Sequence, residues 1–365
     1  MLNITFLSNF YKDPIINILQ LTGHAMNNEA ITDYSAVTRK KINEILSKDE
    51  IRALTSRSDW AGFWAIVSTW AVIAGSFALA AWSLTQAVWL TALVLLLCVI
   101  VIGGRQLALA IATHEATHRT LFATRALNDH FTDWLCARPV GLDLFKYREH
   151  HFIHHLKTGT DEDVDISLIA GLPTTRKSLA RKLLRDAVGI TGMKFMFGQF
   201  VMCAEYMKWT VASNYEWLPK QSRWFHAKRF VINFFPTLIT NLAIAAALMM
   251  FGYGELYALW LIAYLTTYPM FIRIRALAEH AATQRTNNMF ENTRTTRAGW
   301  LAKSLVAPLN VNYHIEHHAL ASVPWYKLPK LHKLFLQRGV VQPAPSYLEV
   351  LRIVSSKNPI STSNA

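Results

Sequence analysis

Nine histidines recur at spacings that place their imidazoles together on helix faces. His114 and His118 are four residues apart, and two later clusters have the form His-x-x-His-His. Residues three and four apart are neighbours on a helix surface, so each cluster presents two or three rings in one direction. Neutral imidazole is a ligand for iron, zinc, copper and nickel. The candidate metal ligands are His114, His118, His151, His154, His155, His280, His314, His317 and His318.

The number of clustered histidines predicts the kind of centre. A single tetrahedral zinc needs no more than four ligands, whereas two metals with open positions can use nine. One histidine pair alone would more often be a surface or structural feature, but three clusters together argue against that interpretation. We expect ordinary structural roles for the isolated histidines and a supporting or surface role for His150. The isolated ones are His24, His130, His226 and His332.

Carboxylates beside the clusters are candidates to hold the ligands in place. A metal-bound imidazole usually donates its other N–H to a carboxylate, which fixes the ring orientation. The same acids could also be helix-surface residues that balance a basic protein, so both interpretations stay open for any one of them. The first candidates are Asp161, Asp163, Glu279 and Glu316, with Asp165, Glu115 and Glu149 as further ones.

Two long segments with almost no charge lie next to these clusters in the sequence. Residues 60–104 contain no Asp, Glu, Lys or Arg, and residues 230–272 contain only Glu255. One bilayer crossing takes about 20 apolar residues. Each segment is therefore long enough for a helical hairpin, and its length argues against the alternative of buried core helices. We predict an all-α integral membrane fold with four spans and a helical cap that holds the metals; the spans are residues 60–82, 87–111, 231–251 and 256–274.

The cations indicate how this fold is oriented. The chain has 37 Lys+Arg and a net charge of +13. Residues 1–59, 105–229 and 273–365 hold 7, 18 and 12 of these cations, and the two short hairpin connections hold none. By the positive-inside rule both termini and all the histidine clusters are cytoplasmic. The basic charge thus indicates topology, and we expect no nucleic-acid partner because no binding motif accompanies it.

The clusters also resemble a known family. Their order and their placement around two hairpins resemble the membrane fatty acid desaturase superfamily, with residues 147–163 similar to its second histidine box and residues 310–332 to its third. The resemblance covers residues 60–335, leaving 1–59 as a cytoplasmic segment and 336–365 as a tail. Ala276 and Ala321 stand where many relatives have Asn and Pro. These departures favour a bacterial-type acyl-lipid enzyme of the inner membrane over an animal acyl-CoA enzyme.

The resemblance implies an O₂-dependent oxidoreductase with two non-haem irons that introduces a double bond into a lipid acyl chain. No fused haem-binding His-Pro-Gly-Gly motif is present, and Cys98, Cys136 and Cys203 are too scattered for an iron–sulfur cluster. We therefore expect a separate electron donor: ferredoxin, rubredoxin or cytochrome b5.

Other outcomes at the same centre remain open, namely hydroxylation, ketolation and alkene-forming decarboxylation, because they differ from desaturation only in substrate placement. A histidine-rich metal transporter is a more distant alternative. It would place its ligands near the bilayer midplane, whereas these clusters lie outside the uncharged segments.

Overall fold

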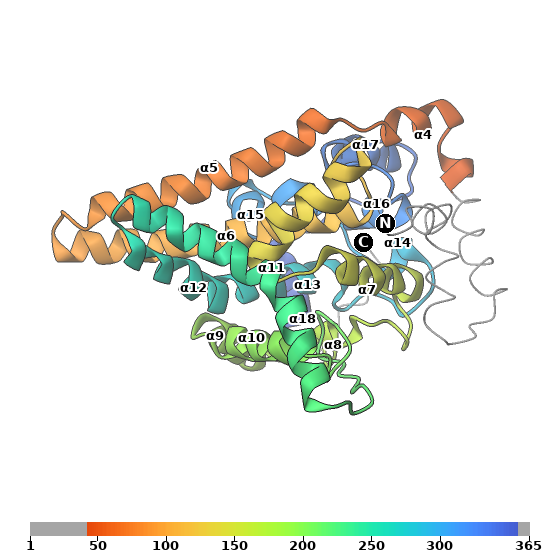
Figure 1. Ribbon diagram of the computed structural model, residues 1–365. Helices are drawn as coiled ribbons and strands as arrows, with labels where there is room; N and C mark the ends of the chain where they lie inside the picture. Colours follow the sequence, from red (N-terminus) through yellow and green to blue (C-terminus); the bar gives the residue numbers. More distant parts are fainter. Residues whose placement is uncertain (1–41, 357–365) are drawn as a thin grey trace. The chain divides into compact units, whose positions relative to one another are not determined.

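The computed structural model describes residues 42–356, which are mostly helical (Figure 1). The chain divides into two compact units at Ser47 and Lys48; the first contributes only one short helical segment to the described residues, and the second carries all the candidate ligands. Within residues 42–356 there is no β-strand, only two isolated bridges. The α-helices of the second unit are α4 Lys48–Thr55, α5 Asp59–Ser83, α6 Val88–Thr117, α7 Leu144–Lys157, α8 Ile166–Ile169, α9 Arg176–Ala187, α10 Ile190–Cys203, α11 Arg223–Met250, α12 Tyr257–Leu265, α13 Thr267–His280, α14 Met289–Asn292, α15 Trp300–Leu305, α16 His314–Ala319, α17 Leu328–Gln337 and α18 Tyr347–Val354.

Three of these helices are long and apolar enough to cross a membrane: α5, α6 and α11. They cover the first three expected spans to within one residue at each end. α5 and α6 pack side by side as a hairpin (Figure 1), and residues 84–87, which connect them, lie within one residue of the connection that the expected spans predicted. α6 continues beyond the expected end of its span and so carries His114 out of the uncharged segment.

The expected fourth span is not one helix. Residues 256–274 are divided between α12 and α13, which meet at Thr266. Pro269 accounts for the break, because proline cannot donate the N–H that would bond to the carbonyl of Leu265 and its ring clashes with that carbonyl. The four-span prediction is therefore not confirmed: among the described residues three helices, not four, qualify by length and composition.

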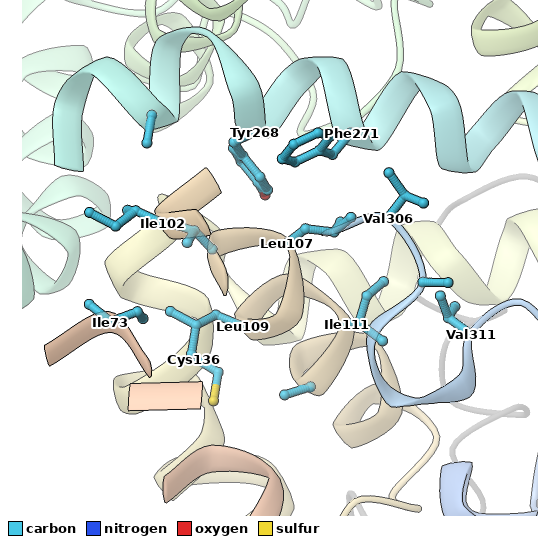
Figure 2. Close-up of a cluster of buried hydrophobic side chains, with 14 of the residues drawn as sticks. Ile73, Ile102, Leu107, Leu109, Ile111, Cys136, Tyr268, Phe271, Val306 and Val311 are labelled. Carbon is cyan, nitrogen blue, oxygen red and sulfur yellow. The ribbon is translucent and has the colours of Figure 1, made fainter. Parts of the chain in front are cut away.

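α6 is the centre of the apolar core. Figure 2 shows Ile102, Leu107, Leu109 and Ile111 on this helix, with side chains from α5, α13 and residues 306–311 around them. Gly103 permits the close approach of α13, because an added Cβ there would lie 2.0 Å from Thr267 Oγ1. This packing anchors the helix that carries the first histidine pair.

The C-terminal part of the described chain is also folded. Residues 347–354, within the segment expected to be a tail, form α18, which begins with a capping box between Ser346 and Glu349 and packs against α13. Val350 and Val354 are buried. Residues 1–41 and 357–365, which include most of the expected N-terminal segment, lie outside the described residues.

Candidate metal centre

The structure brings all nine predicted histidines together in two adjacent groups. Within each group the ligand nitrogens all lie within 4.8 Å of one another. The first group is His114, His118, His151, His155 and His317, and the second is His154, His280, His314 and His318. The two groups adjoin, since the rings of His155 and His318 stack with centroids 4.1 Å apart.

Helix ends and short helices position these side chains. The first pair lies at the C-terminal end of α6, the second cluster on α7, His280 at the last residue of α13, and the third cluster on α16. Asp143 starts α7 by accepting the N–H groups of Phe145 and Lys146 at 3.1 Å, as an N-cap aspartate does. Within the α7 sequence the His-x-x-His-His spacing then turns its three rings toward the other helices.

Arg148 joins α7 to the end of α6. Its guanidinium donates to the carbonyl oxygens of Thr117 at 3.1 Å and Ala116 at 2.9 Å, and it pairs with Asp129 at 2.6 Å. The side chain is buried. It satisfies carbonyls that the helix end leaves without partners, and it sets the distance between the first and second histidine clusters.

The contacts within the first group cannot all be hydrogen bonds. Nε2 of His151 lies 2.9 Å from that of His118 and 3.0 Å from that of His155, whose Nε2 is also 3.0 Å from that of His317. A nitrogen of a neutral imidazole has either one hydrogen or one lone pair. If the His118–His151 and His155–His317 contacts are hydrogen bonds, neither His151 nor His155 keeps a hydrogen or a lone pair for a hydrogen bond between them. A shared cation, by contrast, can accept the lone pairs of all four nitrogens.

The spacing of these nitrogens also fits a metal. Two ligands at right angles around an ion, with bonds of about 2.1 Å, are about 3.0 Å apart. His114 is a further potential metal ligand, since both of its ring nitrogens are buried without a hydrogen-bond partner. Unpaired buried polar atoms are costly, and coordination would remove that cost.

The second group repeats this pattern. Nε2 of His314 is 2.7 Å from that of His280 and 3.1 Å from that of His318. Only one of these two contacts can be a hydrogen bond. Nδ1 of His280 and Nδ1 of His314 have no hydrogen-bond partner. In both groups, therefore, the close and unpaired imidazole nitrogens fit a bound metal cation.

Two acids after α7 accept hydrogen bonds from histidines of that helix. Gly159 has φ +82 and turns the chain back after the helix, so that Asp163 accepts a hydrogen bond from Nδ1 of His154 at 2.8 Å. Asp165 accepts one from Nε2 of His150 at 2.8 Å. Because a carboxylate only accepts, His154 must donate from Nδ1, and its Nε2 lone pair is free for a metal.

The other three acids of the first candidate set occupy different places. Glu279 pairs with Arg275 at 2.7 Å and lies 3.6 Å from Nδ1 of His314. Glu316 is buried but accepts from Thr295 at 2.5 Å and from His332 at 2.7 Å. Asp161 is not brought to the histidines: its carboxylate, with a 91% exposed side chain, pairs with Arg285 on the surface.

Burial keeps most of these imidazoles in the form that binds metals. Burial is the main reason why the pKa values of His151, His155 and His317 lie well below the ordinary value, and the charges of neighbouring imidazoles are the second reason. For His154 burial is again the largest cause and acts in the same direction, but the hydrogen bond to Asp163 and the charges of Asp165, Asp163 and Glu279 together outweigh it and raise the pKa.

Residues 293–296 support the third cluster, a role that no sequence pattern predicted. Thr295 accepts the backbone N–H of Ile315 at 3.1 Å. Arg294 donates to the carbonyl oxygen of Ala281 at 2.8 Å, and its backbone N–H donates to that of Glu279 at 2.8 Å. The segment thereby ties α13 to α16, although Thr and Arg in a loop carry no signal of this in the sequence.

A cavity of about 160 Å³ reaches the histidines from one side. His151, His154, His280 and His314 line its inner end. Much of the remaining lining is apolar or aromatic, and α6, α10, α12 and α13 contribute Leu107, Phe195, Met202, Tyr264, Tyr268 and Ile272. The charged side chains in the lining are Asp163, Asp165, Lys194, Arg275 and Glu279. Such a lining suits an apolar ligand with few polar groups.

The sequence of the chain is similar to those of known proteins. Residues 89–347 match the family model described as fatty acid desaturase. A dihydrorhizobitoxine desaturase from Bradyrhizobium elkanii is 26% identical over 248 residues, covering 66% of this chain and 67% of the relative. The sphingolipid delta(4)-desaturase/C4-monooxygenase DES2 of Mus musculus is 24% identical over 235 residues, covering 62% of this chain and 61% of the relative. With the family model matching most of the chain, the predicted resemblance is confirmed: this protein belongs to the membrane fatty acid desaturase family and is an oxidoreductase.

Proposed function

We propose that the protein is a two-iron, O₂-dependent desaturase that introduces a double bond into a lipid acyl chain. The observation that carries this proposal is the pair of buried histidine groups at the end of a largely apolar cavity. Bound iron supplies the strong oxidant that an unactivated C–H bond requires, which no side-chain acid, base or nucleophile can provide. The nine histidines would hold the two irons.

The reaction balances with an external reductant. Each turnover removes two hydrogens from adjacent methylenes, takes up two electrons and two protons, and reduces one O₂ to two waters. The apolar wall of the cavity binds the acyl chain and excludes water from the reacting carbons. The electrons come from a separate carrier, for which we propose ferredoxin, rubredoxin or cytochrome b5.

We further propose a bacterial inner-membrane location with the histidine side in the cytoplasm. The distribution of the cations supports it. Thr85 lies exposed in the connection between α5 and α6 and should face the periplasm. A Thr85→Cys variant should therefore react with a membrane-impermeant maleimide in intact cells, whereas Lys333→Cys should react only after lysis; the reverse result would invert the topology.

Product analysis tests the reaction itself. The protein is expressed in a bacterial host with simple lipids, and total fatty acids, hydroxy acids and alkenes are measured by mass spectrometry. We expect a new double bond at one position of an acyl chain and about two irons per chain. A His151→Ala variant should lose the new double bond and the iron of the first histidine group. A purified protein that binds zinc or no metal would contradict the proposal.

Hydroxylation is the second candidate. The mouse relative is named both a desaturase and a monooxygenase, and the two outcomes depend only on whether a second hydrogen leaves before oxygen is transferred. A hydroxy acid as the main product would favour this candidate. A ketolated product or a shortened terminal alkene would replace both.

A further inference from the structure

The exposed face of α17 is basic, and it lies outside the cavity that reaches the histidines. Lys330 and Lys333 are exposed one turn apart, and among residues 42–356 neither has an acidic partner. Leu328, Leu331 and Phe335 on the opposite face of the helix are buried. None of the described residues that line the cavity belongs to α17. We call Lys327, Lys330, Lys333 and Arg338 the α17 surface.

Two further contacts fix this surface in place. Lys327 donates to the carbonyl oxygens of Ala53 at 2.6 Å and Ser56 at 2.7 Å, and Arg338 pairs with Glu50 at 2.5 Å. Burial and then the charge of Lys330 lower the pKa of Lys327. Lys327 and Lys330 therefore lie close enough to act together with Lys333 on a partner as one positive field, whereas Glu50 offsets the charge of Arg338.

The α17 surface differs from the other basic helix, α9. Beside the cations of α9, large apolar side chains are exposed: Leu184 at 62% and Val188 at 59%. Cations next to exposed apolar side chains suit a membrane interface. Within α17 Leu336, at 37%, is the one large apolar side chain exposed to this extent, so its surface suits a water-soluble partner.

The α17 surface is also connected directly to the metal centre. His332 is the chain neighbour of Lys333, and its Nδ1 donates to Glu316 at 2.7 Å. Glu316 is fully buried and precedes His317 of the first histidine group. In Figure 1 α17 lies beside α16, in agreement with their contacts. One hydrogen bond and two chain steps thus separate this surface from a candidate ligand.

From these observations we propose that the α17 surface is the docking site of an acidic, water-soluble one-electron carrier protein. This inference rests on the proposed function, because only an enzyme that consumes electrons needs such a partner. The carrier docks by charge complementarity, which speeds encounter and fixes orientation. Two reduced carriers each deliver one electron per turnover and leave oxidised, while the substrate binds in the cavity, which α17 does not line.

Charge reversal tests the proposal. Iron-loaded enzyme in phospholipid nanodiscs is assayed with reduced ferredoxin, rubredoxin or cytochrome b5, and each donor-dependent rate is divided by the rate of the same variant with dithionite. We expect Lys330→Glu/Lys333→Glu to lower this ratio about tenfold at low salt and to weaken its salt dependence. Lys177→Glu/Arg181→Glu, two exposed cations one turn apart on α9, is the matched control and should change the ratio less than about twofold.

The outcomes separate this inference from the proposed function. Equal losses in both variants, no loss in the α17 variant, or a wild-type enzyme that works with dithionite but with none of the three carriers would overturn the docking site. Absence of turnover with dithionite would instead contradict the proposed function. In that case, direct binding of the oxidised carriers to the two variants still decides whether the α17 surface is a docking site.

Discussion

The two histidine groups are neighbours, but the protein surrounds them differently. The first has five histidines, and its nearest acid is Glu115, 3.3 Å from Nδ1 of His114. The second has four and is supported by Asp163 at 2.8 Å and by Glu279 at 3.6 Å. Only His151 of the first group lines the cavity, compared with three members of the second.

This difference suggests a division of roles within one centre. A metal with fewer protein ligands keeps more open positions, and the second group is the one that faces the cavity. Carboxylates that accept from ligating histidines fix the ring orientation and make the imidazole a stronger donor. We therefore expect the second group to face the substrate and to depend on its supporting acids, while the first depends mainly on packing between α6 and α7.

The largest effect should come from removing one ligand of either group. His118→Ala affects only the first group and His280→Ala only the second. Each should reduce iron from about two to about one per chain and lower activity more than about 100-fold, since even loss of a supporting residue can cost that much. Metal analysis and lipid product yields provide the measurement. If either variant loses both irons, the two groups form one coupled site and do not have the separate roles described above.

Removal of a supporting acid should have the next largest effect, confined to the second group. Asp163→Asn should lower the affinity of the second group for iron about 10- to 100-fold in chelator competition, because His154 loses its charged hydrogen-bond acceptor. Asp161→Asn is the matched control, two residues away and paired with Arg285 on the surface. It should leave both irons unchanged, and equal effects of the two substitutions would show that Asp163 has no special role.

A smaller effect on the first group should follow from Arg148→Ala. Loss of this buried guanidinium frees the end of α6 from α7, although Asp129 keeps Arg119 and Arg125 as partners. We expect a fall of about 5 °C in the unfolding midpoint of the detergent-solubilised protein. Glu149→Ala, on the exposed face of the same helix, should leave the midpoint nearly unchanged. The first group should lose iron before the second in chelator competition; the opposite order would count against the role assigned to Arg148.

The smallest effect should come from the helix contact behind the second group. Gly103→Ala would place a Cβ 2.0 Å from Thr267 Oγ1 and 3.0 Å from the backbone nitrogen of Tyr268, so α13 must shift. A few degrees of lost thermal stability are expected. Gly75→Ala, where nothing lies within 4 Å of the added Cβ, should be neutral or slightly stabilising because alanine favours helix. Similar melting curves for the two variants would show that α13 adjusts without cost.

The second predicted hairpin shows which structural features could be predicted from the sequence and which could not. Its first helix, α11, was predictable because a long uncharged segment has few alternatives to a spanning helix. The break before α13 was not predicted, since composition alone did not reveal how Pro269 divides an apolar segment. The acids show the same limit: Asp161 and Asp163 looked equivalent in the sequence, but only Asp163 reaches a clustered histidine, whereas Asp161 pairs with Arg285 on the surface.

The sequence by itself determined which residues could bind metal, the helices that present them and the family. These properties are local: a three- or four-residue spacing sets one helix face, and an uncharged run sets a span. Only the tertiary structure decided that nine histidines divide into groups of five and four, that His151 and His154 on one helix belong to different groups, and that α17 connects the centre to the surface. The physical reason is that each group joins segments far apart in the chain, and packing between helices, rather than spacing within them, brings such segments together.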